Sequence, residues 1–298
     1  DAMTPWPAEV VDRALGAYLG LALGDALGAT VEFMTPREIQ HQFGVHRDIA
    51  GGGWLKLPRG AVTDDTTMSL ALGRAIIDRQ GFNTTAVADS FVAWLRDKPV
   101  DCGNTCRRGI RRYITSGTLT ARANEADGGN GALMRNLPVV LASLKDEQAL
   151  GRWTIAQCHI THHNRLSDAA TLAVSQMVRS LVLGEPKSRC EALAQTLITA
   201  YPVFRFAPYP GRASGYVVDT VQTVLHQFFA HEDFEDCLVA TVNQGEDADT
   251  TGAVAGMLAG ARCGAHKLPY RWLRALDRLI EAQIRAQTTA LLSLAARY

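Results

Sequence analysis

The sequence lacks most of the features that would assign it to an extreme class of protein. Its 298 residues carry no net charge, because 30 basic side chains balance 30 acidic ones, so no global field favours nucleic acid or an anionic membrane as a partner. The six cysteines are scattered and form no C-x-x-C pair, which indicates reduced cytosolic thiols. No apolar run reaches the ~20 residues that a transmembrane helix needs, and the N-terminus carries no recognisable secretory signal. We therefore expect a cytoplasmic protein without a transmembrane segment.

Linkers, repeats and strand patterns are missing as well. No Pro- or Ser-rich linker and no repeat of fixed period divides the chain, which predicts one domain over residues 1–298. Period-2 alternation with β-branched runs is almost absent. We predict an all-α protein, a single compact multi-helix domain. Its helices are expected at residues 8–29, 64–79, 84–97, 104–116, 131–143, 147–160, 167–183, 189–200, 216–230, 233–243, 250–264 and 270–296, the last of them interrupted.

The first expected helix has a glycine at every fourth position from Gly16 to Gly28. Glycine is a poor helix former, so four glycines on one face predict a buried central helix that packs very closely against its neighbours. A single acid, Asp25, interrupts its apolar run, and Glu32 follows just past its end.

Acidic residues crowd the start of another expected helix. Glu246, Asp247 and Asp249 fall within four residues, directly before a run of small uncharged residues from Gly252 to Gly260. A helix N-terminus favours an acid because its first N–H groups lack partners, but three crowded carboxylates repel one another unless they share a cation or a proton. A hard metal cation bound by Asp247, Asp249 and the Thr250 hydroxyl would resolve the conflict. An over-capped helix is the alternative, and this stretch alone leaves both open.

The same combination recurs at Thr63-Asp64-Asp65, where Thr63 is the expected N-cap of a helix. Capping alone would explain one such pair of acids. Because the arrangement occurs twice, the two helix N-termini could face each other across a shared cation site. Together with Glu32 they would supply five carboxylates and two hydroxyls, which are hard oxygen ligands in sufficient number for two ions completed by water.

Two loops are candidates for anion binding. The segment from Asp101 to Thr105 opens a helix whose free N–H groups could bind an anion. The glycine-rich segment from Gly128 to Arg135 brings flexible backbone to another helix start, where Asn130 can both donate and accept hydrogen bonds. Ordinary capped turns have the same composition, so neither loop decides the matter alone.

Two other clusters have simpler interpretations. A zinc site built on Cys158 and the histidines around Thr161 lacks a second ligand pair and is rejected. A run of four arginines is expected to be a solvated helix face, with a docking surface for an acidic partner as the alternative; its members are Arg107, Arg108, Arg111 and Arg112.

Taken in order, six motifs resemble those of the ADP-ribosylglycohydrolase family, and the resemblance covers nearly the whole chain. The motifs are Gly24-Asp25…Glu32, Thr63-Asp64-Asp65, Asp101-x-Gly103-x-Thr105, Gly129-Asn-Gly-Ala-x-Met-Arg135, Thr161-His162 and Asp247-x-Asp249-Thr250-x-Gly252. Six ordered motifs are far more specific than any one of them. The resemblance implies an all-α fold and the hydrolysis of an ADP-ribose conjugate.

The resemblance also implies a binuclear metal centre. By motif match its ligands would be Thr63, Asp64, Asp65, Asp247, Asp249 and Thr250, with Glu32 beside the metals on the substrate side. The bacterial branch of the family is associated with manganese and its relatives with magnesium. Two divalent ions, Mn²⁺ or alternatively Mg²⁺, are therefore the expected cofactors.

Within the family the chain is most similar to the bacterial branch that removes ADP-ribose from an arginine of nitrogenase Fe protein (dinitrogenase reductase). This similarity implies an ADP-ribosylated protein substrate. It also admits a regulatory partner such as a PII-type signalling protein, and reversible membrane association through a partner. Hydrolysis of ADP-ribosyl-serine or of another conjugate is one alternative. A regulator that binds ADP-ribose without cleaving it is the other, and the intact acid set speaks against it because binding alone requires no pair of metals.

The implied catalytic residues are Asp101 and Glu32. Asp101 would transfer a proton or hold the leaving guanidine, helped by Glu125 and Asp127 in the acidic loop before Gly128. A carboxylate forms paired, charge-assisted hydrogen bonds with a planar guanidinium but gains less from a neutral serine oxygen, which favours arginine-linked ADP-ribose as substrate. Substrate binding is assigned to Gly103, Asn104, Thr105, Gly129, Asn130, Gly131, His162 and Tyr216.

Two of these assignments carry alternatives. Tyr216 would stack on the adenine or on the ribose face, and a core tyrosine is the other interpretation. His162 would line the cleft, either as a nucleotide contact or as support for the residues around it.

Overall fold

A computed structural model describes residues 5–126 and 128–297 of the chain. Within these ranges the chain forms fourteen α-helices and three 3-10 helices, two isolated β-bridges and no strand, which confirms the predicted all-α class. The elements in order are α1 (Ala8–Ala29), α2 (Pro36–Phe43), α3 (Asp64–Arg79), α4 (Thr84–Arg96), α5 (Asn104–Ser116), η1 (Leu133–Arg135), α6 (Leu137–Ala142), α7 (Glu147–Thr161), α8 (Arg165–Val182), α9 (Lys187–Ala200), η2 (Pro202–Phe204), α10 (Val217–Ala230), α11 (Phe234–Val242), α12 (Ala248–Cys263), η3 (Ala265–Lys267), α13 (Tyr270–Ala275) and α14 (Arg278–Ala295).

The helix expected at residues 131–143 is two elements, η1 and α6. Pro138 stands at the start of α6 and has no N–H to continue a preceding helix. The side-chain amide of Asn136, between the two elements, donates to the hydroxyls of Thr154 and Ser175 at 2.9 and 2.8 Å. A proline and a buried tertiary hydrogen bond together divide the expected helix.

One unpredicted helix and one predicted interruption have local causes. The short α2 is absent from the expected helices, although Thr35 and Glu38 form a reciprocal capping box at its start. The interruption expected in residues 270–296 falls between α13 and α14, where the Asp277 carboxylate caps α14 by accepting from the N–H of Ile280 at 3.0 Å.

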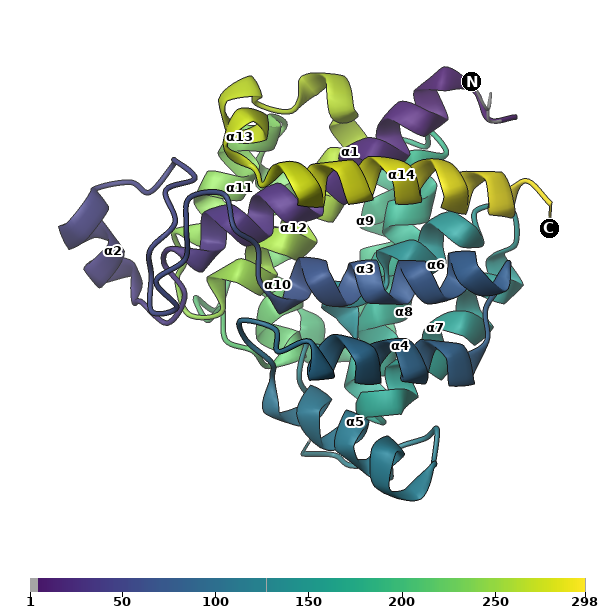
Figure 1. The fold of residues 1–298 in the computed structure, drawn as a ribbon. Coiled ribbons are helices and arrows are strands. Elements are labelled where there is room, and N and C mark those ends of the chain that lie inside the picture. Colours follow the sequence, from purple (N-terminus) through teal and green to yellow (C-terminus); the bar gives the residue numbers. More distant parts are fainter. Residues whose placement is uncertain (1–4, 127, 298) are drawn as a thin grey trace.

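Helices α1 and α12 run antiparallel through the centre of the molecule, with glycine facing backbone on both sides (Figure 1). A Cβ atom added to any glycine of this contact would lie 1.9–2.4 Å from a carbonyl oxygen of the other helix, which no side chain can occupy. The facing pairs are Gly16 with Gly260, Gly20 with Gly256, Gly24 with Gly252, and Gly28 with Ala248. The predicted close packing of the first helix is confirmed, and its partner is the small-residue run after the acidic segment.

Further helices pack outward from this pair. On one side α14 packs on α1, α3 on α14, α4 on α3, and α5 on α4, and Figure 1 shows α14, α3 and α4 running roughly parallel across one face. On the other side α12 contacts α8, α10 and α11. Across the described ranges, no helix combines the length and apolar character that crossing a membrane requires.

Candidate active site

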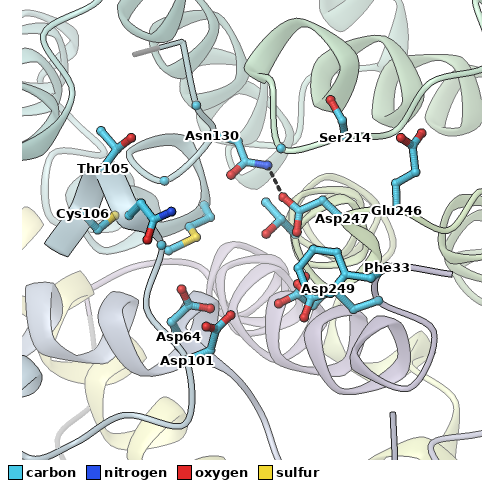
Figure 2. A pocket seen from close by; sticks show the side chains of 18 of the residues that line it. Phe33, Asp64, Asp101, Thr105, Cys106, Asn130, Ser214, Glu246, Asp247 and Asp249 are labelled. Atoms are coloured by element: carbon cyan, nitrogen blue, oxygen red, sulfur yellow. Dashed lines mark hydrogen bonds between the residues drawn. The ribbon is translucent and has the colours of Figure 1, made fainter. Parts of the chain in front are cut away.

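Four helix ends meet around a cleft of about 660 Å³ (Figure 2). They are the C-terminal end of α1 and the N-termini of α3, α5 and α12, and the glycine-rich segment before η1 completes the wall. The cleft contains every predicted site residue except Thr63, Asp65 and Tyr216. Its lining consists of Glu32, Phe33, Met34, Thr35, Asp64, Asp101, Gly103, Asn104, Thr105, Cys106, Gly129, Asn130, Gly131, Met134, His162, Ser214, Gly215, Glu246, Asp247, Asp249 and Thr250.

Carboxylates at this cleft form two groups that share Asp249. Asp25, Asp65 and Asp249 each bring one oxygen within 4.8 Å of the others, and so do Glu32, Asp247 and Asp249. The glycine contacts between α1 and α12 place these groups, because Asp25 lies in α1, Glu32 just past its end, and Asp249 in the first turn of α12. The structure thus brings the two Thr/Asp helix starts and Glu32 together, and adds Asp25.

The Asp25 carboxylate, rather than the Thr63 side chain, caps the N-terminus of α3. Although Thr63 is the N-cap residue of α3, its side chain makes no capping hydrogen bond. Instead Asp25 accepts from the backbone N–H groups of Thr63 and Thr66 at 2.9 and 3.2 Å, and from both their hydroxyls at 2.7 and 2.6 Å. The start of α3 is therefore capped by a carboxylate of α1, which ties the two helices together at the site.

The Thr63 hydroxyl is surrounded by more acceptors than it can serve. Its oxygen lies 2.7 Å from Asp25 Oδ1, 3.2 Å from Asp65 Oδ1 and 3.0 Å from Asp249 Oδ2, yet a hydroxyl has one proton to donate. The second oxygens, Asp65 Oδ2 and Asp249 Oδ1, are buried without any hydrogen-bond partner. Such oxygens are costly unless a proton or cation satisfies them. An all-oxygen set of this kind suits a hard divalent cation, so the residues present fit a metal site.

Burial raises the pKa of five carboxyls here. The pKa of Asp25 rises to about 6 and that of Glu32 to about 7. For Asp64, Asp65 and Asp249 burial again comes first, and the pKa rises well above the ordinary value of an aspartic acid. Neighbouring carboxylates add to the shift, as Asp64 does for Asp65. A bound cation would act in the opposite direction by favouring the ionised forms.

Asp64 and Asp101 line the cleft outside the two carboxylate groups, and each feels the charge of a neighbour (Figure 2). Burial raises the pKa of Asp101, and the charge of Asp247 raises it further. Asp101 Oδ1 accepts from the N–H of Cys102 at 2.8 Å, which fixes the carboxyl at the mouth of the loop before α5. This hydrogen bond does not involve Oδ2.

The glycine-rich segment is joined to the acids through Asn130. Its amide donates to Asp247 Oδ2 at 2.7 Å (Figure 2). The same amide donates to the Thr220 hydroxyl at 2.9 Å, and the backbone N–H of Asn130 donates to the carbonyl of Gly215 at 3.1 Å. His162 lies beneath this segment, since a Cβ on Gly131 would fall 2.8 Å from its ring. Burial lowers the pKa of His162 to about 3, so this imidazole is neutral and supports the loop.

Tyr216 and Glu125 lie outside the cleft lining. Tyr216 is 42% exposed, so its interpretation as a core residue is wrong. Its ring lies against Gly128 and its backbone pairs with Gly129, at the edge of the glycine-rich wall. The exposed Glu125 carboxylate pairs with Arg165 at 3.6 Å and does not join Asp101. Asp127 lies outside the described residues.

Two acids differ from what their sequence context predicts. Glu246 belongs to the acidic segment, but it pairs with Arg212 at 2.7 Å and accepts from the N–H of Ala213 at 2.7 Å. Asp25 is absent from the predicted ligands although it faces Asp65 and Asp249. The available signal was a lone charge within an otherwise apolar glycine-rich helix, because a buried acid requires partners.

Comparison with known proteins places this site in a family. The profile described as ADP-ribosylglycohydrolase matches residues 6–298. The chain is 54% identical over 287 residues to the ADP-ribosyl-[dinitrogen reductase] glycohydrolase of Rhodospirillum rubrum, covering 96% of this chain and 98% of that protein. It is 29% identical to the ADP-ribosylarginine hydrolase Tri1 of Pseudomonas putida (strain GB-1), covering 91% and 76% respectively. A solved ADP-ribosylglycohydrolase-related protein complex matches with a TM-score of 0.86 and 36% identity, over 97% of this chain and all of that one.

Proposed function

The chain belongs to the ADP-ribosylglycohydrolase family, and we propose that it hydrolyses the bond between ADP-ribose and an arginine side chain of nitrogenase Fe protein (dinitrogenase reductase), restoring that protein's activity. The relatives named for dinitrogen reductase and for ADP-ribosylarginine support the linkage and the target. The observation that carries the proposal is the convergence of Glu32, Asp101 and the shared carboxylate groups on one cleft beside free helix N-termini.

The proposed metal site holds divalent cations, with Mn²⁺ first and Mg²⁺ second. Its ligands would be Thr63, Asp64, Asp65, Asp247, Asp249 and Thr250, and Asp25 would orient Thr63 and complete the charge. Two ions is the number we propose, because the carboxylates form two groups around Asp249. Bound ions would neutralise the crowded acids and polarise the ribose hydroxyls of the substrate.

The diphosphate and the riboses would lie along the wall of the cleft that the start of α5 and the glycine-rich segment form. Helix α5 begins at the N-cap Gly103, and no side chain caps it, so its first N–H groups are free to receive an anion. Gly129 and Gly131 let backbone approach the ligand closely, and Asn130 is held in place by Asp247 and Thr220. Tyr216, exposed beside Gly128, would cover the adenine.

Hydrolysis replaces the bond from ribose C1 to a guanidine nitrogen with a bond to a water oxygen. We assign to Glu32 the removal of a proton from that water, because its carboxyl lines the cleft beside Asp247 and Asp249, where the sugar bond would break. Asp101 would return a proton to the departing guanidine and then hold it through charge-assisted hydrogen bonds. Burial raises the pKa of Asp101, and the cleft-facing carboxyl keeps Oδ1 fixed on the N–H of Cys102.

Arginine linkage is tested with matched peptides that carry ADP-ribose on arginine or on serine, at one Mn²⁺ concentration. A charge-assisted hydrogen bond lost on the serine peptide is worth about 1.5–3 kcal/mol, so we expect arginine to be preferred by roughly 10- to 100-fold in kcat/KM. Equal or faster release from serine would move the enzyme to serine conjugates. Tight binding of ADP-ribose without release from either peptide would identify a binding regulator.

Regulation is also part of the proposal. The resemblance to the nitrogenase-directed branch suggests a PII-type signalling protein as partner, and reversible association with a membrane through such a partner. Size-exclusion chromatography of the purified chain with a PII protein measures this directly. Separate elution of the two proteins would remove the partner from the proposal.

A further inference from the structure

Two large aromatic side chains lie exposed beside the carboxylates. Phe33 is 65% exposed and Trp54 is 49% exposed, and their ring centroids are 5.2 Å apart. Phe33 lines the cleft, and in Figure 2 its ring lies on the side that holds Asp247 and Asp249. We refer to Phe33 and Trp54 as the aromatic pair. Contiguous exposed apolar surface rimmed by polar residues is typical of ligand-binding grooves and interaction sites.

A tight, glycine-rich turn positions Trp54. Residues 52–57 form a tight turn closed by reciprocal backbone hydrogen bonds between Gly52 and Leu57, at 2.8 and 3.1 Å. Gly51, Gly52 and Gly53 all have positive φ, which glycine adopts at little cost. A Cβ on Gly53 would lie 2.6 Å from the carbonyl of Ala29, so the turn is pressed against the end of α1. The glycine run therefore brings the indole over the last turn of that helix.

Trp54 holds a residue of the site. Its indole N–H donates to Glu32 Oε1 at 2.5 Å, and Glu32 belongs to a carboxylate group with Asp247 and Asp249. Phe33, the next residue, has a φ of +67°, which is uncommon for a bulky side chain. Its N–H donates to the carbonyl of Glu246 at 2.6 Å. The aromatic pair is thus fixed in place next to the proposed base.

We propose that the aromatic pair recognises the arginine side chain that carries the ADP-ribose. This inference rests on the proposed function. Phe33 would place its ring face against the guanidinium or its alkyl stem, and Trp54 would act as the positioning residue that orients Phe33 and Glu32. An aromatic face next to a carboxylate is the combination that binds a guanidinium, through cation–π attraction and charge-assisted hydrogen bonds.

The position of the pair distinguishes arginine from adenine as its ligand. Phe33 lies with Glu32, Asp247 and Asp249, where the sugar bond to the protein would break. The adenosine end would instead lie along the glycine-rich wall, which has its own exposed aromatic in Tyr216. An adenine against Phe33 would leave that wall without a ligand. The leaving group is the part of the substrate that must extend outward past the pair to the rest of the target protein.

Steady-state kinetics of Phe33→Leu on an arginine-modified peptide tests the inference. Loss of a cation–π contact corresponds to an increase in KM of about 2- to 30-fold, with kcat changed less than KM. The inhibition constant of free ADP-ribose should stay within about twofold, because ADP-ribose lacks the guanidinium. Trp54→Phe keeps a ring but removes the N–H to Glu32, so its effect should appear mainly in kcat. Tyr270→Leu is the matched control, since Tyr270 is 73% exposed and absent from the cleft lining.

Each outcome has one meaning. A higher KM for the arginine peptide with an unchanged inhibition constant supports recognition of arginine. A parallel rise in the inhibition constant would show that Phe33 holds the nucleotide and would overturn the inference. Unchanged kinetics in Phe33→Leu would overturn it as well. Failure of the proposed function looks different, because the wild-type enzyme would then not release ADP-ribose from the arginine peptide at all. Melting curves of all three variants confirm that each is folded.

Discussion

Replacing Gly24 by alanine tests the contact between α1 and α12 most directly. The new Cβ would lie 1.9 Å from the carbonyl oxygen and 2.3 Å from the carbonyl carbon of Gly252, whereas ordinary contact begins at 3.4 Å. The two helices must therefore separate locally by about 1.5 Å, the difference between 3.4 and 1.9 Å. No side chain can rotate away, because the atoms that are struck belong to backbone.

The magnitude follows from two opposing terms. Overpacking a tight interior costs about 1–3 kcal/mol, and more where the neighbours cannot move. Alanine in place of glycine stabilises a helix by about 1 kcal/mol, which offsets part of the cost. Because the atoms that are struck belong to backbone, the cost should lie at or above the upper end of that range, about 3–5 kcal/mol. The net destabilisation is then about 2–4 kcal/mol, corresponding to a fall in Tm of about 4–8 °C. The variant should also bind metal more weakly, because the strain falls next to Asp25.

The assay is thermal unfolding with and without Mn²⁺, and the control is Gly151→Ala. Gly151 lies in α7 with nothing within 4 Å of an added Cβ, so this substitution should leave Tm unchanged or raise it by about 2 °C through helix propensity alone. A Gly24→Ala protein that melts at or above the wild-type temperature would refute the reasoning, and so would one that matches Gly151→Ala.

Three further predictions concern the acids. Chelation should abolish turnover and lower Tm, since a ligand at a hundredfold excess over Kd stabilises the folded state by about 2.7 kcal/mol. Mn²⁺ should restore both, and Asp249→Asn should lose metal as well as turnover. Elemental analysis that finds no divalent metal in active protein would contradict this prediction. Asp101→Asn should retain metal and ADP-ribose binding but lower kcat by about 10²–10⁴-fold, and near wild-type kcat would reduce Asp101 to a structural role. Metal-free protein should lose stability as pH rises from about 4 to 7. Burial raises the pKa of Asp25 to about 6 and that of Glu32 to about 7. The folded state therefore binds more protons than the unfolded state over this pH range, and stability falls as those protons are lost. Added metal should reverse that trend, and a metal-free Tm that climbs between pH 5 and 7 would count against the protonated cluster.

Much of the architecture could be predicted because it depends on local periodicity. Four glycines spaced by four residues have few explanations other than close helix packing, and the structure supplies the matching partner in α12. The meeting of the Thr63 and Asp247 segments could be anticipated because the combination of a threonine with two carboxylates recurs at both helix starts. The same kind of reasoning located the free start of α5, where Gly103 offers no capping side chain.

Other features depend on contacts between distant parts of the chain, and sequence patterns did not contain them. The capping of α3 by Asp25 crosses from one helix to another, whereas the local rule assigned that task to Thr63. The division of residues 131–143 requires Asn136 to find Thr154 and Ser175. Three consecutive glycines at 51–53 predict a loop, but only the folded chain shows that this loop sets Trp54 against Glu32.

The glycine contacts between α1 and α12 also limit how the active site can fail. Because facing positions recur every four residues along both helices, the pair has no intermediate alignments: a slide of one residue drives methyl groups into backbone. The next clash-free alignment lies four residues away, a displacement of about 6 Å along the helix axis. Such a step would carry Asp25 and Glu32 beyond reach of Asp249. The relative positions of the acids are therefore set by the one alignment of α1 and α12 that avoids these clashes. Substitutions along this contact should therefore act by pushing the two helices apart, which lowers stability and metal affinity together, rather than by sliding the acids past one another.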